Sequence, residues 1–194
     1  ACVNNTCIGE AAGGSITTGD NNLVIGHDAG KSGSPVTITT GDNTICLGNN
    51  SISNFYCAQD SISTSDGRDK TDVETFTHGL DFVNQMRPVT YRWDKRSWYA
   101  GDDPTDEEVN SATPDGSKKR SAIQLGFIGQ EVQEIERQYG YSEVKEDGSA
   151  DTDTELVVDT TSTQLGLQYS RVVPILVKSI QELSAKNDAL EARV

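Results

Sequence analysis

The first third of the chain repeats a short pattern. Residues 19–26 (GDNNLVIG) and 41–48 (GDNTICLG) match at an offset of 22, and residues 3–9 (VNNTCIG) match the first of these at an offset of 17. Each unit has a polar turn, a few residues that favour a β-strand, and a final glycine. Short repeats of this kind are typical of coiled β structures, in which each unit forms one rung. The alignment makes three positions equivalent: Cys7, Val24 and Cys46.

The repeats contain few apolar residues, and their strands are too short for a single chain to bury a core within residues 1–64. The sequence therefore predicts a short-strand β-helical or β-roll fibre segment whose core is shared by several chains, most simply three around an axis. The Gly-Asp-Asn steps allow calcium binding as an alternative. The tandem nonapeptide of calcium-binding β-rolls is absent, so turn formation is the better explanation, and we expect neither a metal nor a cofactor.

The composition changes near Ser65. Residues 1–64 contain six of the 46 charged side chains and all four cysteines, whereas residues 65–194 contain ten of the twelve aromatic residues. We predict a domain boundary at this point, with the fibre segment over residues 1–64 and a globular domain over residues 65–194. The chain starts at Ala1 rather than Met and enters the repeat at once, so we expect it to be the C-terminal part of a longer protein.

The formal charge of −14 argues against nucleic acid as a partner, because binding to phosphates depends on Lys and Arg. No apolar run approaches the roughly 18 residues that span a bilayer, and no signal peptide is visible. We therefore expect a soluble chain with no membrane insertion. The cysteines lack CxxC spacing, and we expect all four to be small buried hydrophobic residues. They are Cys2, Cys7, Cys46 and Cys57.

After Ser65 the pattern indicates an α+β domain. The expected elements are a helix over 78–86, strands over 89–93 and 124–128, a helix over 130–138 with Val132 and Ile135 facing inward, and a short strand over 155–159. The spacing from Thr71 to Glu74 predicts a capping box. Residues 101–120 are polar and predict a solvated loop. His27 and His78 are interpreted as surface residues.

The last segment carries a heptad pattern. One series contains Val173, Ile180, Asn187 and Val194, and a second series, three residues later, contains Leu176, Leu183 and Leu190. The pattern predicts a helix over about 172–194, with Pro174 in its first turn. Such a helix either forms a coiled coil between chains or packs on its own domain. A buried Asn187 would cost stability and fix the register, which favours association between chains.

The candidate catalytic residues lie at the change in composition, in the run SDGRDK at 65–70. A serine hydroxyl becomes nucleophilic when a base takes its proton, and Ser–Lys pairs are a known form of this arrangement. Lysine acts as a base only when it is neutral, which requires burial or nearby positive charge. Arg68 is placed to supply such a charge to Lys70, Asp66 is expected to stabilise a turn, and Asp69 would favour the ammonium form.

Four motifs, in this order, resemble one known family. They are the run at 65–70, MRPVTYRW at 86–93, GFIGQEV at 126–132, and YSRVVPIL at 169–176 followed by IQEL at 180–183. The resemblance is to the endosialidase-type C-terminal intramolecular chaperone domain of phage tail fibres and tailspikes. Two residues depart from the family pattern: Asp69 replaces an apolar residue, usually leucine, and Gly129 replaces alanine. Gln130 and Glu131 are interpreted as the start of a helix.

The resemblance implies a homotrimer in which the chaperone aligns the preceding β fibre and then removes itself by autoproteolysis between Thr64 and Ser65. Ser65 would be the nucleophile and Lys70 its base, with Asp66 and Arg68 in supporting positions. The chain would be a single-turnover serine autoprotease with no external substrate and no cofactor. It would assemble in the host cytoplasm and belong to the virion, where the fibre meets a host cell-surface receptor after the chaperone domain is released.

Two other functions remain possible from the sequence. The first is a trimerisation and receptor-binding tip that never cuts itself. The second, a glycan hydrolase, is disfavoured because the acidic residues concentrate in two polar stretches, 101–108 and 143–159, and offer no good carboxylate pair. The sequence also leaves open whether Lys70 acts on Ser65 of its own chain or of a neighbour.

Overall fold

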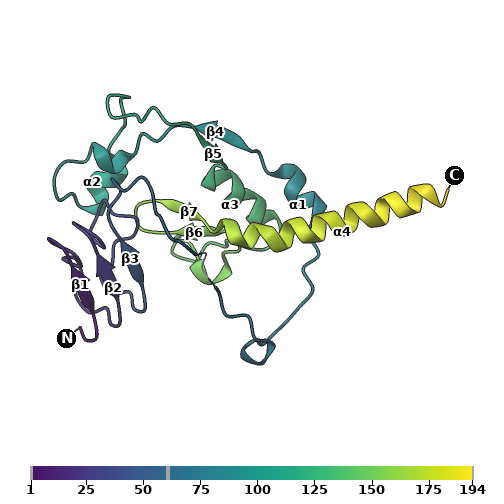
Figure 1. Ribbon diagram of the computed structural model, residues 1–194, viewed down its shortest axis with the longest axis horizontal. Helices are drawn as coiled ribbons and strands as arrows, with labels where there is room; N and C mark the ends of the chain where they lie inside the picture. Colours follow the sequence, from purple (N-terminus) through teal and green to yellow (C-terminus); the bar gives the residue numbers. More distant parts are fainter. Residues whose placement is uncertain (1, 60–61, 194) are drawn as a thin grey trace. The chain divides into compact units, whose positions relative to one another are not determined.

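The computed structural model describes residues 2–59 and 62–193 (Figure 1). The strands are β1 (Thr6–Ile8), β2 (Leu23–Ile25), β3 (Ile45–Leu47), β4 (Val89–Tyr91), β5 (Gln124–Gly126), β6 (Val158–Thr160) and β7 (Leu165–Leu167). The helices are α1 (Leu80–Gln85), α2 (Asp106–Ser111), α3 (Gly129–Gln138) and α4 (Val172–Glu191), with 3-10 turns η1 (Gly67–Asp69), η2 (Arg96–Trp98), η3 (Thr152–Thr154) and η4 (Tyr169–Arg171). This mixture, with its long last helix, confirms the α+β class. Ala1, and Val194 at the end of the predicted heptad, lie outside the described residues.

The chain divides into two compact units, each assembled from several segments. Unit 1 consists of Ala1–Phe55, Thr90–Gly126 and Thr160–Leu165. Unit 2 consists of Tyr56–Val89, Phe127–Asp159 and Gly166–Val194. Segments from the second half of the chain therefore belong to the same unit as the repeats. The functional boundary at Ser65 stays a prediction, because it concerns cleavage rather than packing.

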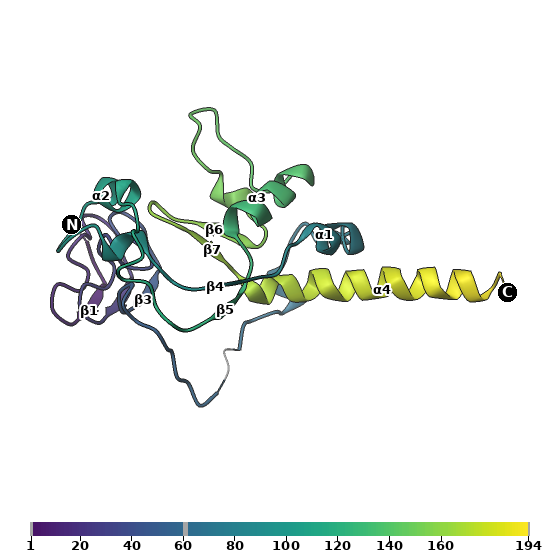
Figure 2. The ribbon, with the colours of Figure 1, turned by 90° about the horizontal axis from the view of Figure 1, so that it is seen from above.

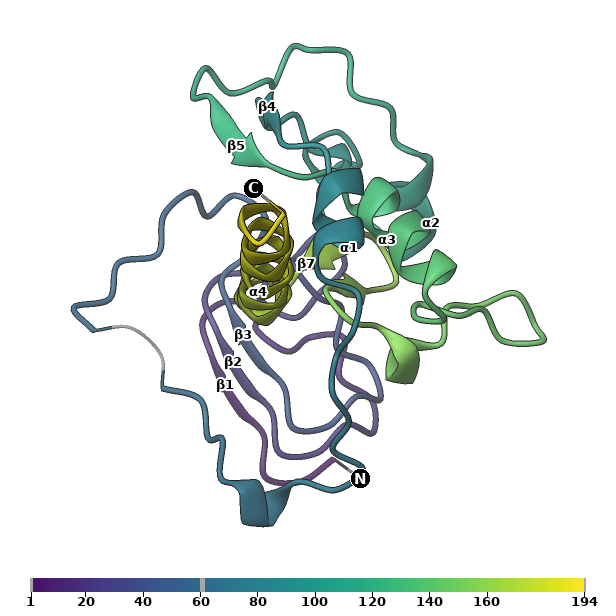
Figure 3. The ribbon, with the colours of Figure 1, turned by 90° about the vertical axis from the view of Figure 1, so that its right-hand side faces the viewer.

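In unit 1, strands β1, β2 and β3 and their connecting turns form what we call the β coil. The strands run parallel and in register, and they pair Cys7 with Val24 and Val24 with Cys46. This pairing confirms the equivalence that the repeat predicted. The three rungs follow one another side by side in Figure 3, with the strands on one side and the longer turns opposite.

The polar turns of the β coil form a hydrogen-bond ladder between rungs. The Asn22 side chain accepts a hydrogen bond from the backbone N–H of Thr44 at 2.9 Å and donates one to the carbonyl of Gly41 at 3.0 Å. Asn5 does the same one rung earlier, accepting from the N–H of Asn22 and donating to Gly19. The Gly-Asp-Asn steps thus satisfy backbone groups that the short strands leave unpaired.

The β coil buries a small core within a single chain, so the prediction that one chain could not do this was wrong, while a core shared by three chains stays a prediction. Val24, Ala29, Ile38 and Cys46 are at most 3% exposed. Ala29 and Ile38 come from the long turn between β2 and β3, which folds back over the strand face and supplies the apolar surface that the strands lack. The other three cysteines are exposed, so the prediction of burial holds only for Cys46.

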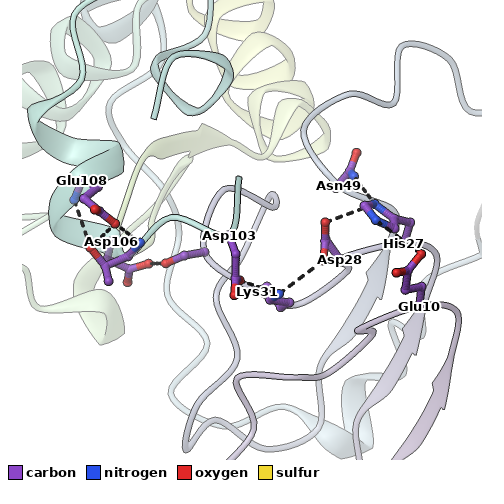
Figure 4. A network of polar contacts seen from close by, with 10 residues as sticks. Glu10, His27, Asp28, Lys31, Asn49, Asp103, Asp106 and Glu108 are labelled. Carbon is purple, nitrogen blue, oxygen red and sulfur yellow. Dashed lines mark hydrogen bonds and ion pairs between the residues drawn. The ribbon is translucent and has the colours of Figure 1, made fainter. Parts of the chain in front are cut away.

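The acidic stretch after residue 101 is not simply a solvated loop, as the sequence had indicated. It contains α2, which begins with a capping box formed by Thr105 and Glu108. The carboxylate of Asp106 accepts hydrogen bonds from Ser32 and from Thr37 in the β coil. The Nζ of Lys31 lies 2.5 Å from Oδ1 of Asp103 and also forms an ion pair with Asp28. Figure 4 shows this network. Asp103 is the main reason that the pKa of Lys31 is raised.

In unit 2, α1 packs against the first half of α4 (Figure 2). The contact buries Phe82 of α1 completely, and Ile175 of α4 is only 2% exposed. Glu182 on α4 accepts a hydrogen bond from the N–H of Leu80 at 2.8 Å, which lowers the pKa of that carboxyl group. The carboxylate therefore caps the start of α1, where backbone N–H groups have no partner within the helix.

Helix α3 buries Val132 and Ile135, as predicted. The same helix buries Glu136, whose carboxylate accepts a hydrogen bond from Ser142 and three from the N–H groups of residues 156–158. This carboxylate fixes the start of β6. The predicted capping box at Thr71 was wrong, because residues 71–78 form no helix.

Helix α4 uses one face within unit 2 and leaves its heptad face exposed. Val172, Ile175 and Ser179 are buried. The exposed fraction is between 43% and 67% for the apolar heptad residues Val173, Leu176, Ile180, Leu183 and Leu190. The two alternatives predicted for this helix are therefore compatible, since packing on its own unit leaves the heptad series free. No helix in the described part of the chain is long and apolar enough to cross a membrane.

A Gly79→Ala substitution tests the packing of α1 on α4. A Cβ at this position would lie 2.7 Å from backbone atoms of Lys178 and Ser179, so the helices would have to separate. We expect the free energy of unfolding, measured with urea, to fall by about 1–3 kcal/mol. Gly41→Ala is the control, because a Cβ there meets nothing within 4 Å. An equal loss in both variants would contradict this packing.

Candidate functional site

The candidate site is built on the short 3-10 turn η1 in unit 2. Asp66 precedes the turn in an extended conformation, and its carboxylate accepts a hydrogen bond from the N–H of Arg68 at 2.9 Å. Lys70 follows the turn, and its N–H bonds to the carbonyl of Gly67. An Asp-Gly pair suits such a turn because Asp can bond to the backbone two residues later. The turn reverses the chain, so that residues 65 and 70 lie side by side.

The turn brings the two predicted catalytic residues into direct contact. The Nζ of Lys70 donates a hydrogen bond to the Oγ of Ser65 at 2.7 Å. Both residues belong to the same chain, and the hydroxyl lies next to the peptide bond that joins Thr64 to Ser65. All three residues are exposed. This distance is within the range expected for a nucleophile and its base.

Asp66 and Arg68 form an ion pair on the outside of the turn. The Nη2 of Arg68 lies 2.6 Å from Oδ2 of Asp66, and its Nε contacts both carboxylate oxygens. The Arg68 side chain, together with its backbone N–H, lowers the pKa of Asp66. The interpretation of Asp66 as a turn residue is confirmed. The charge of Arg68 faces Asp66, and its predicted effect on Lys70 stays a prediction.

The loop around the turn has little contact with its own unit. Within the described part of the chain, residues 62–75 are all exposed, and their hydrogen bonds are to one another. Two apolar side chains of this loop, Ile62 and Val73, are 97% and 76% exposed. The Ser65–Lys70 pair, which we call the dyad, therefore lies on an exposed segment that its own unit does not cover.

An aromatic cluster fixes the end of this loop. The ring of His78 lies 4.5 Å from that of Tyr139, which also stacks on Phe82. Phe76 contacts both His78 and Tyr141. His78 is half-buried, so its interpretation as a surface residue was wrong. No sequence pattern indicates this cluster, because its two groups of residues, 76–82 and 139–141, lie about 60 positions apart.

His27 is exposed, as predicted, and takes part in a polar network on the β coil (Figure 4). It lies 3.1 Å from Asp28 and 3.9 Å from Glu10. Glu10, His27 and Asn49 each follow the glycine that ends a strand, so the rungs place them in one column. Within the described residues, no group of three or more His, Cys, Asp and Glu side chains is arranged to hold a metal ion.

Two of the sequence motifs meet in an ion pair that sequence reasoning missed. Arg87 binds Glu131 with two hydrogen bonds, one from Nε at 3.2 Å and one from Nη2. This contact raises the pKa of Arg87. Glu131 lies in the first turn of α3, which confirms its predicted structural position. The ion pair connects the segment after α1 to α3. It makes no contact with Ser65 or Lys70.

Part of the chain matches a known family. Residues 65–143 match the family model described as chaperone of endosialidase, which is named as a peptidase family. The matched segment begins at Ser65 and includes Lys70, Arg87 and Glu131. It contains three of the four motifs found in the sequence and ends before α4. A comparison of the whole chain with curated proteins gave no match.

Proposed function

Residues 65–143 form an endosialidase-type chaperone domain, and from this we propose that the chain is the C-terminal part of a phage tail fibre or tailspike that cuts itself between Thr64 and Ser65. The observation that carries the proposal is the 2.7 Å hydrogen bond between Lys70 and Ser65. The start of the family match at Ser65 supports the same position. The chain acts on itself, once, and needs no external substrate.

The reaction proceeds in two steps. Lys70 in its neutral form takes the proton from Ser65 Oγ, which attacks the carbonyl carbon of Thr64. The C–N bond breaks, the nitrogen of Ser65 receives the proton from Lys70, and an ester joins Thr64 to the Ser65 side chain. Water then hydrolyses the ester, which leaves a carboxylate on Thr64 and a free amine and hydroxyl on Ser65.

Assembly activates the dyad. An exposed lysine is an ammonium ion and cannot accept a proton, whereas burial favours the neutral amine. The loop carries exposed Ile62 and Val73, which a neighbouring copy would cover. We propose that neighbours in a homotrimer bury the loop and supply the N–H donors for the oxyanion. Lys70 and Ser65 come from one chain, and the neighbours complete their surroundings.

Helix α4 associates the chains. Its heptad residues are exposed along the face that does not contact α1, which is the arrangement a coiled coil needs. Asn187 occupies the first series and would fix the axial register at some cost in stability. Three aligned helices place three chaperone domains, and hence three cleavage loops, at the same level.

Alignment serves the fibre because short, similar rungs can pair in shifted registers. A common end gives the chains one starting register, and removal of the chaperone after cleavage makes the product slow to unwind. The released fibre would reach a host cell-surface receptor as part of the virion. The chain would complete these steps in the host cytoplasm.

A second candidate is a trimerisation and receptor-binding tip that is never cut. Asp69 favours it, since this residue replaces the apolar side chain that is usual in the family immediately before the lysine. The same helix α4 would hold the chains together in this case. The two candidates differ only in whether the Thr64–Ser65 bond survives.

Mass spectrometry of freshly expressed protein distinguishes them. We expect the wild-type chain to give fragments of residues 1–64 and 65–194, whereas Ser65→Ala and Lys70→Met remain full length. Ser63→Ala is the matched control, because it removes a neighbouring hydroxyl outside the dyad and should still be cut. Full-length wild-type protein, or cleavage of the Ser65→Ala chain at the same bond, would refute autoproteolysis by Ser65.

Replacement of Asp69 tests the proposed role of Lys70 as a base. Asp69→Leu removes the charge that precedes Lys70 in the sequence and restores the apolar residue usual at this position in the family, so cleavage should be about 3–10 times faster in a time course after synthesis. Asp72→Asn removes an acid that lies farther along the loop and should change the rate less than twofold. A slower reaction in Asp69→Leu would contradict this role.

A charge on the heptad face of α4 tests the trimer. In a Ser65→Ala background, which keeps the chain intact, we expect Ile180→Glu to convert a trimer into monomers in sedimentation velocity. Gln181→Glu adds the same charge one position away, outside both heptad series, and should remain trimeric. With Ser65 restored, Ile180→Glu should also slow cleavage at least tenfold. A trimeric Ile180→Glu chain would exclude α4 as the interface.

A further inference from the structure

Unit 1 contains an open cavity of about 540 Å³ that the proposed reaction does not use. One wall is the chain that leaves β3, residues 52–54, and the other is formed by residues near β4 and β5. Both walls belong to the same unit. The cavity is lined by three large side chains whose chemistry can be followed: Trp93, Lys95 and Arg120.

Two half-buried cations share this cavity without a carboxylate to neutralise them. Within the described residues, no acidic side chain forms an ion pair with Lys95 or Arg120. Their contacts are neutral: Lys95 Nζ bonds to the side-chain oxygen of Asn50 at 3.2 Å, and Arg120 Nη2 bonds to the carbonyl of Ser51 at 2.8 Å. Burial and the charge of Arg120 lower the pKa of Lys95.

This arrangement is unusual for a chain with 30 acidic and 16 basic side chains. Two cations held together in partial burial repel each other, and an anion between them would relieve that repulsion. Arg120 has five N–H donors and uses one of them on Ser51, so several remain for a bound oxyanion. The fixed backbone acceptors also hold both side chains in place before a ligand arrives.

The third side chain provides a flat surface next to the charges. Trp93 is 42% exposed, and Lys95 Nζ lies 4.8 Å from the centre of its ring. The ring centres of Trp93 and Tyr91 lie 5.1 Å apart, and the two rings are nearly perpendicular. This T-shaped contact fixes the orientation of the Trp93 ring. An oriented aromatic ring with a few convergent polar groups is the usual composition of a small-molecule site.

We propose that this cavity binds an oxyanion, a carboxylate or a phosphate, carried by a ring that packs on Trp93. Lys95 and Arg120 bind the oxyanion, and Trp93 contacts the apolar face of the ring. The site lies outside the cleavage loop and does not depend on autoproteolysis. It gives unit 1 a ligand-binding role of its own, whether or not the chain is cut.

Four probes separate the contributions of charge and ring: inorganic phosphate, glucose 6-phosphate, glucuronate and glucose. Trp93 and Trp98, which stacks with Arg120, are the two tryptophans of the chain, so intrinsic fluorescence reports directly on this region. With full-length Ser65→Ala protein at low salt, we expect saturable changes with glucose 6-phosphate or glucuronate and none with glucose. The tighter of the two anions identifies the oxyanion as phosphate or carboxylate.

Substitutions locate the binding. We expect Arg120→Gln to weaken it at least tenfold, because a charge-assisted hydrogen bond is lost. Arg120→Lys retains a charge and a donor to Ser51, and should recover part of the affinity in a chain that folds normally by circular dichroism. Lys119→Gln removes the adjacent exposed cation, which does not line the cavity, and should leave the affinity unchanged.

Three results would overturn the proposal. They are the absence of saturable binding for every anion, equal affinity in Arg120→Gln and the parent chain, and equal weakening by Lys119→Gln, which would indicate attraction to surface charge in general. Inorganic phosphate that binds as tightly as glucose 6-phosphate would refute the contact between the ring and Trp93.

Discussion

The contact between Lys70 and Ser65 depends on a turn of only three residues. Asp66 starts the turn through its bond to the N–H of Arg68, and the N–H of Lys70 closes it on the carbonyl of Gly67. If the chain stayed extended over these five positions, the Cα atoms of Ser65 and Lys70 would lie about 16 Å apart, since each residue spans roughly 3.3 Å. The local sequence therefore brings the two side chains together within an exposed loop.

The sequence analysis had linked burial of the core of the repeats to association between chains. In the structure these are separate features. The β coil has its own small core around Val24 and Ile38, while apolar side chains such as Ile8 and Ile45 stay exposed on its strands. In the proposed trimer, the exposed heptad face of α4 and the loop around Ser65 would contact neighbouring chains. This division would suit the proposed chaperone, which would align chains that already have local structure of their own. It also explains why the dyad remains accessible in the single chain.

The features predicted correctly are those encoded locally. The spacing of apolar residues located α3 and the heptad series, and the repeat alignment gave the register of β1, β2 and β3. Most of the errors concern contacts between distant segments. The coil core escaped prediction because a long turn, rather than a strand, supplies Ala29 and Ile38. The capping-box spacing at Thr71 was misleading because no helix follows it. The capping box that does form, between Thr105 and Glu108, lies in a stretch that was predicted to be a polar loop. The pairing of Arg87 with Glu131 spans 44 residues and has no periodic signal.

The central claim is that Ser65 Oγ attacks Thr64 and forms an ester within one chain. Hydroxylamine tests it directly, because it cleaves esters far faster than amides and leaves a hydroxamate on the acyl carbon. When the wild-type chain folds in its presence, the fragment ending at Thr64 should carry a hydroxamate in mass spectrometry, and Lys70→Met should give none. A fragment that carries only a carboxylate at every hydroxylamine concentration would mean that water attacks the peptide bond directly, and would contradict the account.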